Sequence, residues 1–158
     1  MEEGLQLKYK GPLNLVLADD DSDDRDLFEE AANFVEPGIK IITTRDGEEL
    51  MDHLIKASTK PDIIFLDLNM PRKNGKECLV EIQKDQSLKN IPVIIYSTSL
   101  NQLEVQETFA IGARHFLRKP NSFEELKEIL QRLLKSNLSQ AGSKETFVLN
   151  RENKMAFK

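Results

Sequence analysis

The sequence predicts a doubly wound α/β domain, a five-stranded parallel sheet with helices on both faces. Two observations support this class. Short runs of apolar or β-branched residues alternate five times with segments whose apolar residues recur at helical spacing. Several of these runs are apolar at nearly every position, as expected of strands covered on both faces. Because parallel neighbours need crossover connections, which are nearly always right-handed, the alternation indicates strands side by side with helices packed outside them.

The first strand is expected in residues 13–21, LNLVLADDD, an apolar run that ends abruptly in acids. A helix follows, and either Asp21 or Ser22 can cap it. Asp23 and Asp24 fall in its first turn, where negative charge complements the helix dipole. The apolar positions of this helix are Leu27, Phe28, Ala31, Ala32 and Val35.

A turn at Pro37–Gly38 precedes the second strand, residues 39–44, which is rich in β-branched residues. Asp46–Gly47 interrupts the chain before a second helix. Pro61 then precedes the third strand, residues 62–68 with the sequence DIIFLDL, and a short third helix follows. The apolar positions of these two helices are Leu50, Met51, Leu54 and Ile55, and then Cys78, Leu79 and Ile82.

The fourth strand is expected in residues 91–99, IPVIIYSTS, and a weakly apolar helix follows over residues 103–110. The turn Gly112–Ala113 leads to the fifth strand, residues 114–120, RHFLRKP. The last helix is strongly amphipathic. Its apolar positions are Phe123, Leu126, Ile129, Leu130, Leu133 and Leu134.

The length of 158 residues corresponds to one compact domain. We expect an N-terminal extension over residues 1–12 and the α/β domain over residues 13–136. Residues 137–158 read as a polar C-terminal tail without a core of its own, apart from a short apolar stretch at residues 147–149.

Composition excludes several classes of protein. No apolar run is long enough to span a bilayer, and the N-terminus carries two acids where a secretory signal carries positive charge. Cys78 is the only cysteine, which rules out an internal disulfide and a Cys/His zinc cluster. The net charge of -5 argues against binding to nucleic acid. We therefore expect a cytoplasmic protein that binds neither membranes nor nucleic acid.

Polar residues lie at the carboxyl ends of four of the predicted strands: Asp19 and Asp20, then Asp67, then Ser97, then Lys119. In doubly wound sheets the functional site lies at the carboxyl ends of the strands, so these side chains should converge. Carboxylates held close together repel one another unless a cation lies among them, and a hard divalent ion such as Mg²⁺ suits oxygen ligands.

An aspartate in such a pocket can attack phosphorus to give an acyl phosphate, provided that the oxygens of the transferring group are neutralised. The metal ion and Lys119 would do this together. The hydroxyl of Ser97 would donate to one phosphoryl oxygen, so that it is held differently with and without phosphate.

With these motifs, residues 13–134 resemble the receiver domain of two-component response regulators. The resemblance rests on Asp19–Asp20, on DLNMPRKNG at residues 67–75, on Ser97 and on GARHFLRKP at residues 112–120. It implies a flavodoxin-like fold with strand order 2-1-3-4-5. The ADDDSDDR start, the QKDQSLKNIPV connection and the STS ending look most similar to stand-alone regulators paired with bacterial phytochrome kinases.

The resemblance also implies the metal ligands. Asp67 would be the phosphoacceptor and, with Asp20 and the backbone carbonyl of Asn69, would ligate Mg²⁺ or Mn²⁺ directly. Asp19 would act mostly through water.

The resemblance further implies which residues respond to phosphorylation. Ser97, Thr98 and Lys119 would bind phosphoryl oxygens, and Phe116 would move inward as Ser97 shifts. The bond between Lys119 and Pro120 would be cis.

The resulting prediction is a signalling protein that catalyses only its own aspartyl phosphorylation and dephosphorylation. A sensor histidine kinase or histidine phosphotransfer protein would donate to Asp67. The change at Ser97 and Phe116 would then alter the surface of the fourth helix, fifth strand and fifth helix, which a downstream protein reads. A homodimer could form through that face or through the C-terminal tail.

Two other classes stay open. A metal-dependent phosphohydrolase with an aspartyl-phosphate intermediate would normally have a second aspartate two residues after the nucleophile, where this chain has Asn69. A degenerate interaction module that takes no phosphate would not need every acidic, hydroxyl and amine position to be present.

Overall fold

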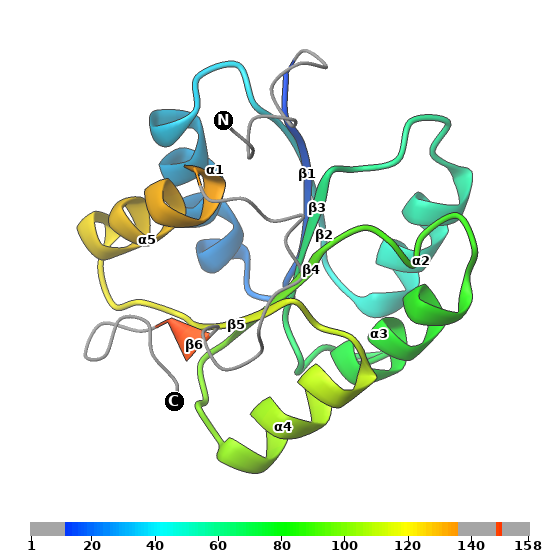
Figure 1. Cartoon of the computed structure of the whole chain (residues 1–158). Helices are drawn as coiled ribbons and strands as arrows, with labels where there is room; N and C mark the ends of the chain where they lie inside the picture. Colours follow the sequence, from blue (N-terminus) through cyan, green and yellow to red (C-terminus); the bar gives the residue numbers. More distant parts are fainter. Residues whose placement is uncertain (1–11, 136–147, 150–158) are drawn as a thin grey trace.

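Strands and helices alternate along the chain in the predicted order (Figure 1). The computed structural model describes residues 12–135 and 148–149. The strands are β1 (Asn14–Ala18), β2 (Lys40–Thr44), β3 (Ile63–Leu66), β4 (Val93–Ser97), β5 (His115–Arg118) and β6 (Val148–Leu149). The helices are α1 (Ser22–Val35), α2 (Gly47–Lys56), α3 (Gly75–Lys84), α4 (Gln102–Ile111) and α5 (Phe123–Lys135).

The strands form one sheet in the order β2-β1-β3-β4-β5-β6, and every neighbouring pair is parallel. The order predicted for the first five strands is therefore confirmed. Helices α1 and α5 cover one face of the sheet, whereas α2, α3 and α4 cover the other (Figure 1). Because all strands run the same way, the loops that follow β1, β3, β4 and β5 lie along one edge.

The sixth strand was not predicted. It comes from the segment expected to be a polar tail without a core of its own, and it pairs Val148 with Phe116 and Leu149 with Leu117. Strand β5 would otherwise end the sheet with backbone N–H and C=O groups unpaired on one side, and a short apolar segment can pair with them. The rest of the tail and residues 1–11 lie outside the described residues.

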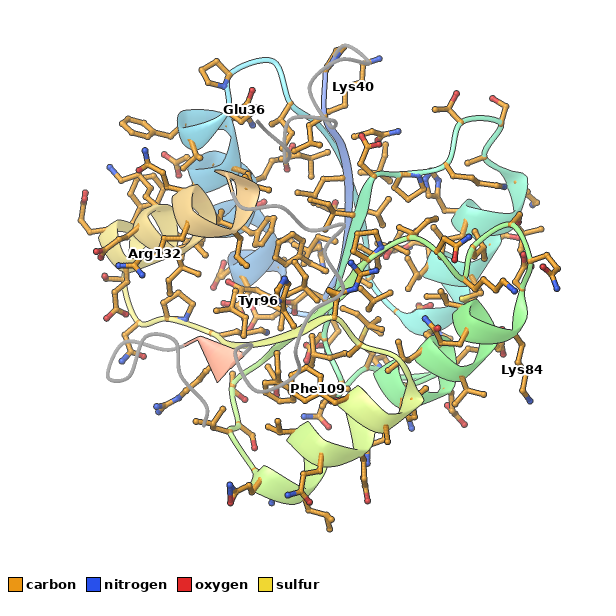
Figure 2. All side chains as sticks on the ribbon, viewed as in Figure 1. Glu36, Lys40, Lys84, Tyr96, Phe109 and Arg132 are labelled. Carbon is orange, nitrogen blue, oxygen red and sulfur yellow. The ribbon has the colours of Figure 1, made fainter. Side chains whose placement is uncertain are left out.

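Two apolar layers hold the sheet between the helices, because successive strand side chains point to opposite faces. Leu15 and Leu17 of β1 pack toward α1 and α5, whereas Val16 and Ala18 pack toward the other helices. Tyr96 and Phe109, both labelled in Figure 2, belong to these opposite layers. The strands in the middle of the sheet are therefore apolar at nearly every position, as predicted.

Side-chain caps explain where the helices begin. Of the two candidates for α1, Asp21 is the N-cap, and its carboxylate accepts from the backbone N–H groups of Asp23 and Asp24. Asp46 caps α2, and Asn74 forms a reciprocal capping box at the start of α3. Within the described ranges, no helix is both long and apolar enough to cross a bilayer.

The loop between β3 and α3 is held by close contacts with the start of α2. A Cβ atom on Gly47 would lie 2.1 Å from the carbonyl oxygen of Lys73, so only glycine fits there. Arg72 has a positive φ of 66°, and its Nε donates to Asp46 Oδ2 at 2.9 Å. This loop begins at Asp67, so the start of α2 supports the segment that carries the predicted phosphoacceptor.

We expect the Gly47→Ala substitution to lower the free energy of unfolding by about 3 kcal/mol, the upper part of the range for overpacking, because the contact is with backbone. Urea denaturation at equilibrium measures this value. Gly38→Ala is the comparison, because Gly38 has a φ of 91° but no atom within 4 Å of the added Cβ. Its cost should be about 1 kcal/mol, from the left-handed backbone alone. Equal costs for the two substitutions would contradict the steric explanation.

Candidate functional site

Three carboxylates converge at the edge where β1 and β3 end. Oxygen atoms of Asp19, Asp20 and Asp67 all lie within 4.8 Å of one another. The backbone brings them together, because the N–H of Asp67 donates to the carbonyl of Ala18 at 3.0 Å. The end of β3 is thereby fixed beside the end of β1. Asp19 and Asp67 are buried, whereas Asp20 is exposed.

Local hydrogen bonds orient the two buried carboxylates. The N–H of Asp21 donates to Asp19 Oδ1 at 3.0 Å, and the N–H of Asn69 donates to Asp67 Oδ1 at 3.2 Å. A Cβ on Gly75 would lie 2.3 Å from the carbonyl oxygen of Asp67, so the start of α3 packs directly against the backbone of this residue. Asp67 is thus held through its carboxylate by Asn69 and through its backbone by the start of α3.

Lys119 supplies positive charge to this cluster. The backbone N–H of Lys119 donates to the carbonyl of Ser97 at 2.7 Å, which extends the β4–β5 pairing as far as the lysine. Its Nζ lies 2.8 Å from Asp19 Oδ2, 2.9 Å from Asp24 Oδ2 and 3.4 Å from Asp67 Oδ2. One ammonium group therefore contacts three carboxylates.

Burial and crowding shift the pKa values of these groups. Burial raises the pKa of Asp67 to about 7; the charge of Lys119 opposes this shift and that of Asp19 adds to it. Burial also raises the pKa of Asp19, whereas the contact with Lys119 opposes this shift. Burial lowers the pKa of Lys119, but Asp19 and Asp24 outweigh it and leave that pKa above its ordinary value. Negative charge at the site exceeds what the lysine neutralises, which favours a further cation.

The predicted switch residues lie on β4 and β5. Ser97 is fully buried, and its Oγ accepts from the N–H of Ser99 at 3.2 Å, whereas Thr98 is exposed. Phe116 is fully buried and pairs in register with Ile95, two residues before Ser97. The structure thus places Ser97 beside the lysine and Phe116 in the apolar layer under α4.

All peptide bonds among the described residues are trans, including the one between Lys119 and Pro120. This contradicts the cis bond expected from the resemblance. The trans form of an X–Pro bond is preferred by about 0.5–1 kcal/mol, so it is the expected isomer unless surrounding contacts select the other.

Two residues at the site were missed in the sequence. Asp24 was assigned only to the first turn of a helix, but it contacts Lys119. Tyr96 was read only as part of a strand, but its ring centroid lies 5.4 Å from Lys119 Nζ. The choice of Asp21 as the cap is the signal that could have placed Asp24, since first-turn residues of α1 lie at the edge where β1 ends.

The donor set fits a hard divalent cation, because carboxylate oxygens are the ligands that Mg²⁺ and Mn²⁺ prefer. An ammonium group and a buried hydroxyl lie at the same edge, where they could bind the oxygens of a phosphoryl group. The arrangement can therefore support phosphoryl transfer to Asp67.

Comparison with known proteins gives a consistent result. The family model for the response regulator receiver domain matches residues 15–131. Response regulator Rcp1 of Synechocystis is 31% identical over 125 residues, covering 76% of this chain and 85% of Rcp1.

Solved structures agree with this match. The phosphorylated cyanobacterial phytochrome response regulator RcpA superposes with a TM-score of 0.76 at 31% identity, covering 84% of this chain and 98% of RcpA. The Mn²⁺-bound form of Rcp1 superposes with a TM-score of 0.72 at 29% identity, covering 83% of this chain and 98% of that one.

We expect Asp67→Asn to stabilise the metal-free protein at neutral pH by roughly 1–3 kcal/mol. A carboxyl group whose folded pKa is raised contributes stability that is present below its ordinary pKa of 3.8 and is lost as the pH rises through about 7. The gain from the substitution should therefore be small near pH 4 and largest above pH 7. Urea denaturation in EDTA across this range measures it.

Asp26→Asn is the matched control for this substitution, since Asp26 is an exposed acid on α1. A gain from Asp67→Asn that does not change with pH, or that Asp26→Asn reproduces, would show that the buried charge is not the cause.

Proposed function

Because the chain belongs to the receiver domain family of response regulators, we propose that Asp67 is the residue that accepts the phosphoryl group. Members of this family are phosphorylated by histidine kinases and act as signalling proteins. The observation that carries the proposal is the position of Asp67, buried at the edge of the sheet between Asp19, Asp20 and Lys119.

The contact between Lys119 and Asp67 supports direct transfer of the phosphoryl group to Asp67. A carboxylate oxygen of Asp67 attacks phosphorus while the P–N bond of a phosphohistidine on the partner breaks, so that the imidazole leaves and an acyl phosphate forms. Lys119 donates to an oxygen of the transferring group and balances the charge that collects there. The chain thus promotes only its own phosphorylation and dephosphorylation.

Asp20 and Asp67, with the backbone carbonyl of Asn69, are the proposed direct ligands of Mg²⁺ or Mn²⁺, and Asp19 acts through water. The 4.8 Å grouping of the three carboxylates supports this set, as does the Mn²⁺-bound form of the relative Rcp1. Such an ion, when bound, neutralises the carboxylates and the transferring oxygens, which Lys119 alone does not balance.

The proposed output is a change in the face formed by α4, β5 and α5, where β6 pairs with the edge of β5. Ser97, assisted by Thr98, would turn its hydroxyl toward a phosphoryl oxygen, and Phe116 would follow because the two residues lie on paired strands. Helix α4 buries only part of its surface, and Leu103 is 62% exposed. A helix held by few apolar contacts can be repositioned at low cost.

The proposed donor is a phytochrome-type histidine kinase or a histidine phosphotransfer protein, which the similarity to RcpA supports. Residues 13–136 would form the receiver domain, and a second copy could bind through the α4–β5–α5 face or the tail. The alternative of a phosphohydrolase has no support from the site, because the position two residues after Asp67 carries the amide of Asn69 rather than a general acid.

We expect Asp67→Ala to abolish phosphorylation by acetyl phosphate in the presence of Mg²⁺, because the attacking oxygen is gone. Mass spectrometry of the intact protein would show one added phosphoryl group on the native chain and none on the variant. Undiminished phosphorylation of the variant would exclude Asp67 as the acceptor, and sustained release of phosphate from a small phosphomonoester would favour the phosphohydrolase instead.

We expect Asp20→Asn to weaken Mg²⁺ binding at least about ten-fold, because it removes a charged ligand. Isothermal titration calorimetry with Mg²⁺, or electron paramagnetic resonance with Mn²⁺, measures the affinity. Asp26→Asn again serves as the control and should change the affinity little. Native affinity in the Asp20 variant would exclude Asp20 from the set of ligands.

A further inference from the structure

Three carboxylates surround the ammonium group of Lys119, which has three N–H donors. It donates hydrogen bonds to Asp24 and Asp67 and forms an ion pair with Asp19. The contact with Asp24, at 2.9 Å, is shorter than the contact with Asp67, at 3.4 Å. Asp24 is not one of the three acids grouped closely enough to share a metal ion. Asp24 therefore holds Lys119 more closely than the predicted phosphoacceptor does, without belonging to the group of acids that could bind a metal ion.

Resting on the proposed function of Asp67, we propose that Asp24 is a positioning residue that competes with the phosphoryl group for Lys119. In the unphosphorylated protein Asp24 holds the ammonium group at the rim of the pocket. Phosphorylation of Asp67 then requires one N–H of Lys119 to turn from Asp24 to a phosphoryl oxygen.

Burial explains why the Asp24 contact is the one that opens. The Asp24 side chain is 33% exposed, whereas that of Asp19 is fully buried. Water can solvate the carboxylate of Asp24 when the lysine leaves, but not that of Asp19. The charge of Asp24 also repels an incoming phosphoryl group, so the residue opposes phosphorylation both directly and through Lys119.

The start of α1 does not depend on this ion pair. The backbone N–H of Asp24 is held by the carboxylate of Asp21 at 3.1 Å, and the cap remains when the Asp24 side chain changes. Asp24→Asn can therefore be tested in a folded protein. Asp23→Asn is a matched control, because Asp23 lies in the same turn, carries the same charge and is exposed.

The test uses beryllium fluoride with saturating Mg²⁺, which forms a complex with an aspartate carboxylate that resembles an acyl phosphate. Fluorine NMR titration of the full chain gives its affinity. We expect Asp24→Asn to bind beryllium fluoride about three- to ten-fold more tightly than the native protein, and Asp23→Asn to stay within about two-fold of it.

The same substitutions made in a Lys119→Met protein show whether the effect of Asp24 on beryllium fluoride affinity depends on Lys119. In Lys119→Met there is no ammonium group to release, so adding Asp24→Asn should give only the gain from removing its direct repulsion, which is smaller than its gain in the native chain. A loss of folding would not produce this pattern, because it would weaken binding in every background.

The outcomes separate this inference from the proposed function. If the native protein shows no bound signal, or Asp67→Ala retains it, the assignment of Asp67 fails. If Asp67 is required but Asp24→Asn binds no more tightly than Asp23→Asn, or gains as much in the Lys119→Met background, only the competition by Asp24 is overturned.

Discussion

The contact between one ammonium group and three carboxylates determines how the carboxyl edge of this sheet is built. Asp19 and Asp67 are buried close together, and without Lys119 their charges would face each other in a medium of low dielectric constant. The lysine reaches them because the pairing of β5 with β4 continues to its backbone N–H. The register of a strand thereby sets the charge balance of a site whose acids come from two other strands.

The rest of the fold supplies the stability that this site lacks. Apolar layers on both faces hold the strands, so the strand ends have little freedom to separate and relieve the repulsion. Gly75 packs against the carbonyl of Asp67, and Tyr96 places its ring beside Lys119. A buried carboxylate with a raised pKa is costly in isolation, and that same cost favours binding of a cation.

Periodicity and strand ends were enough to predict the five strands and the convergence of Asp19, Asp20, Asp67 and Lys119, because parallel sheets leave few alternatives. The strand order came from the resemblance to receiver domains. Individual contacts and the sixth strand depend on three-dimensional geometry that the hydrophobic pattern of the sequence does not specify. The contact of Asp24 with Lys119 requires knowing which residue caps α1, and one position of uncertainty rotates each side chain by about a quarter of a turn. The pairing of β6 with β5 joins residues that are distant in sequence. The bond before Pro120 is trans, the isomer that X–Pro bonds prefer, whereas the resemblance to the family had implied cis.

The two edge regions of the sheet are protected in different ways from pairing with strands of other molecules. At β2 the exposed charge of Lys40 makes a second chain a poor neighbour, although Ile42 is 42% exposed there. At β5 the protection comes from β6, which uses the backbone groups that would otherwise act as a template for strands of other molecules. Strand β6, which lies outside the predicted domain, thus limits the growth of intermolecular sheets. Its removal should make the protein more prone to aggregate.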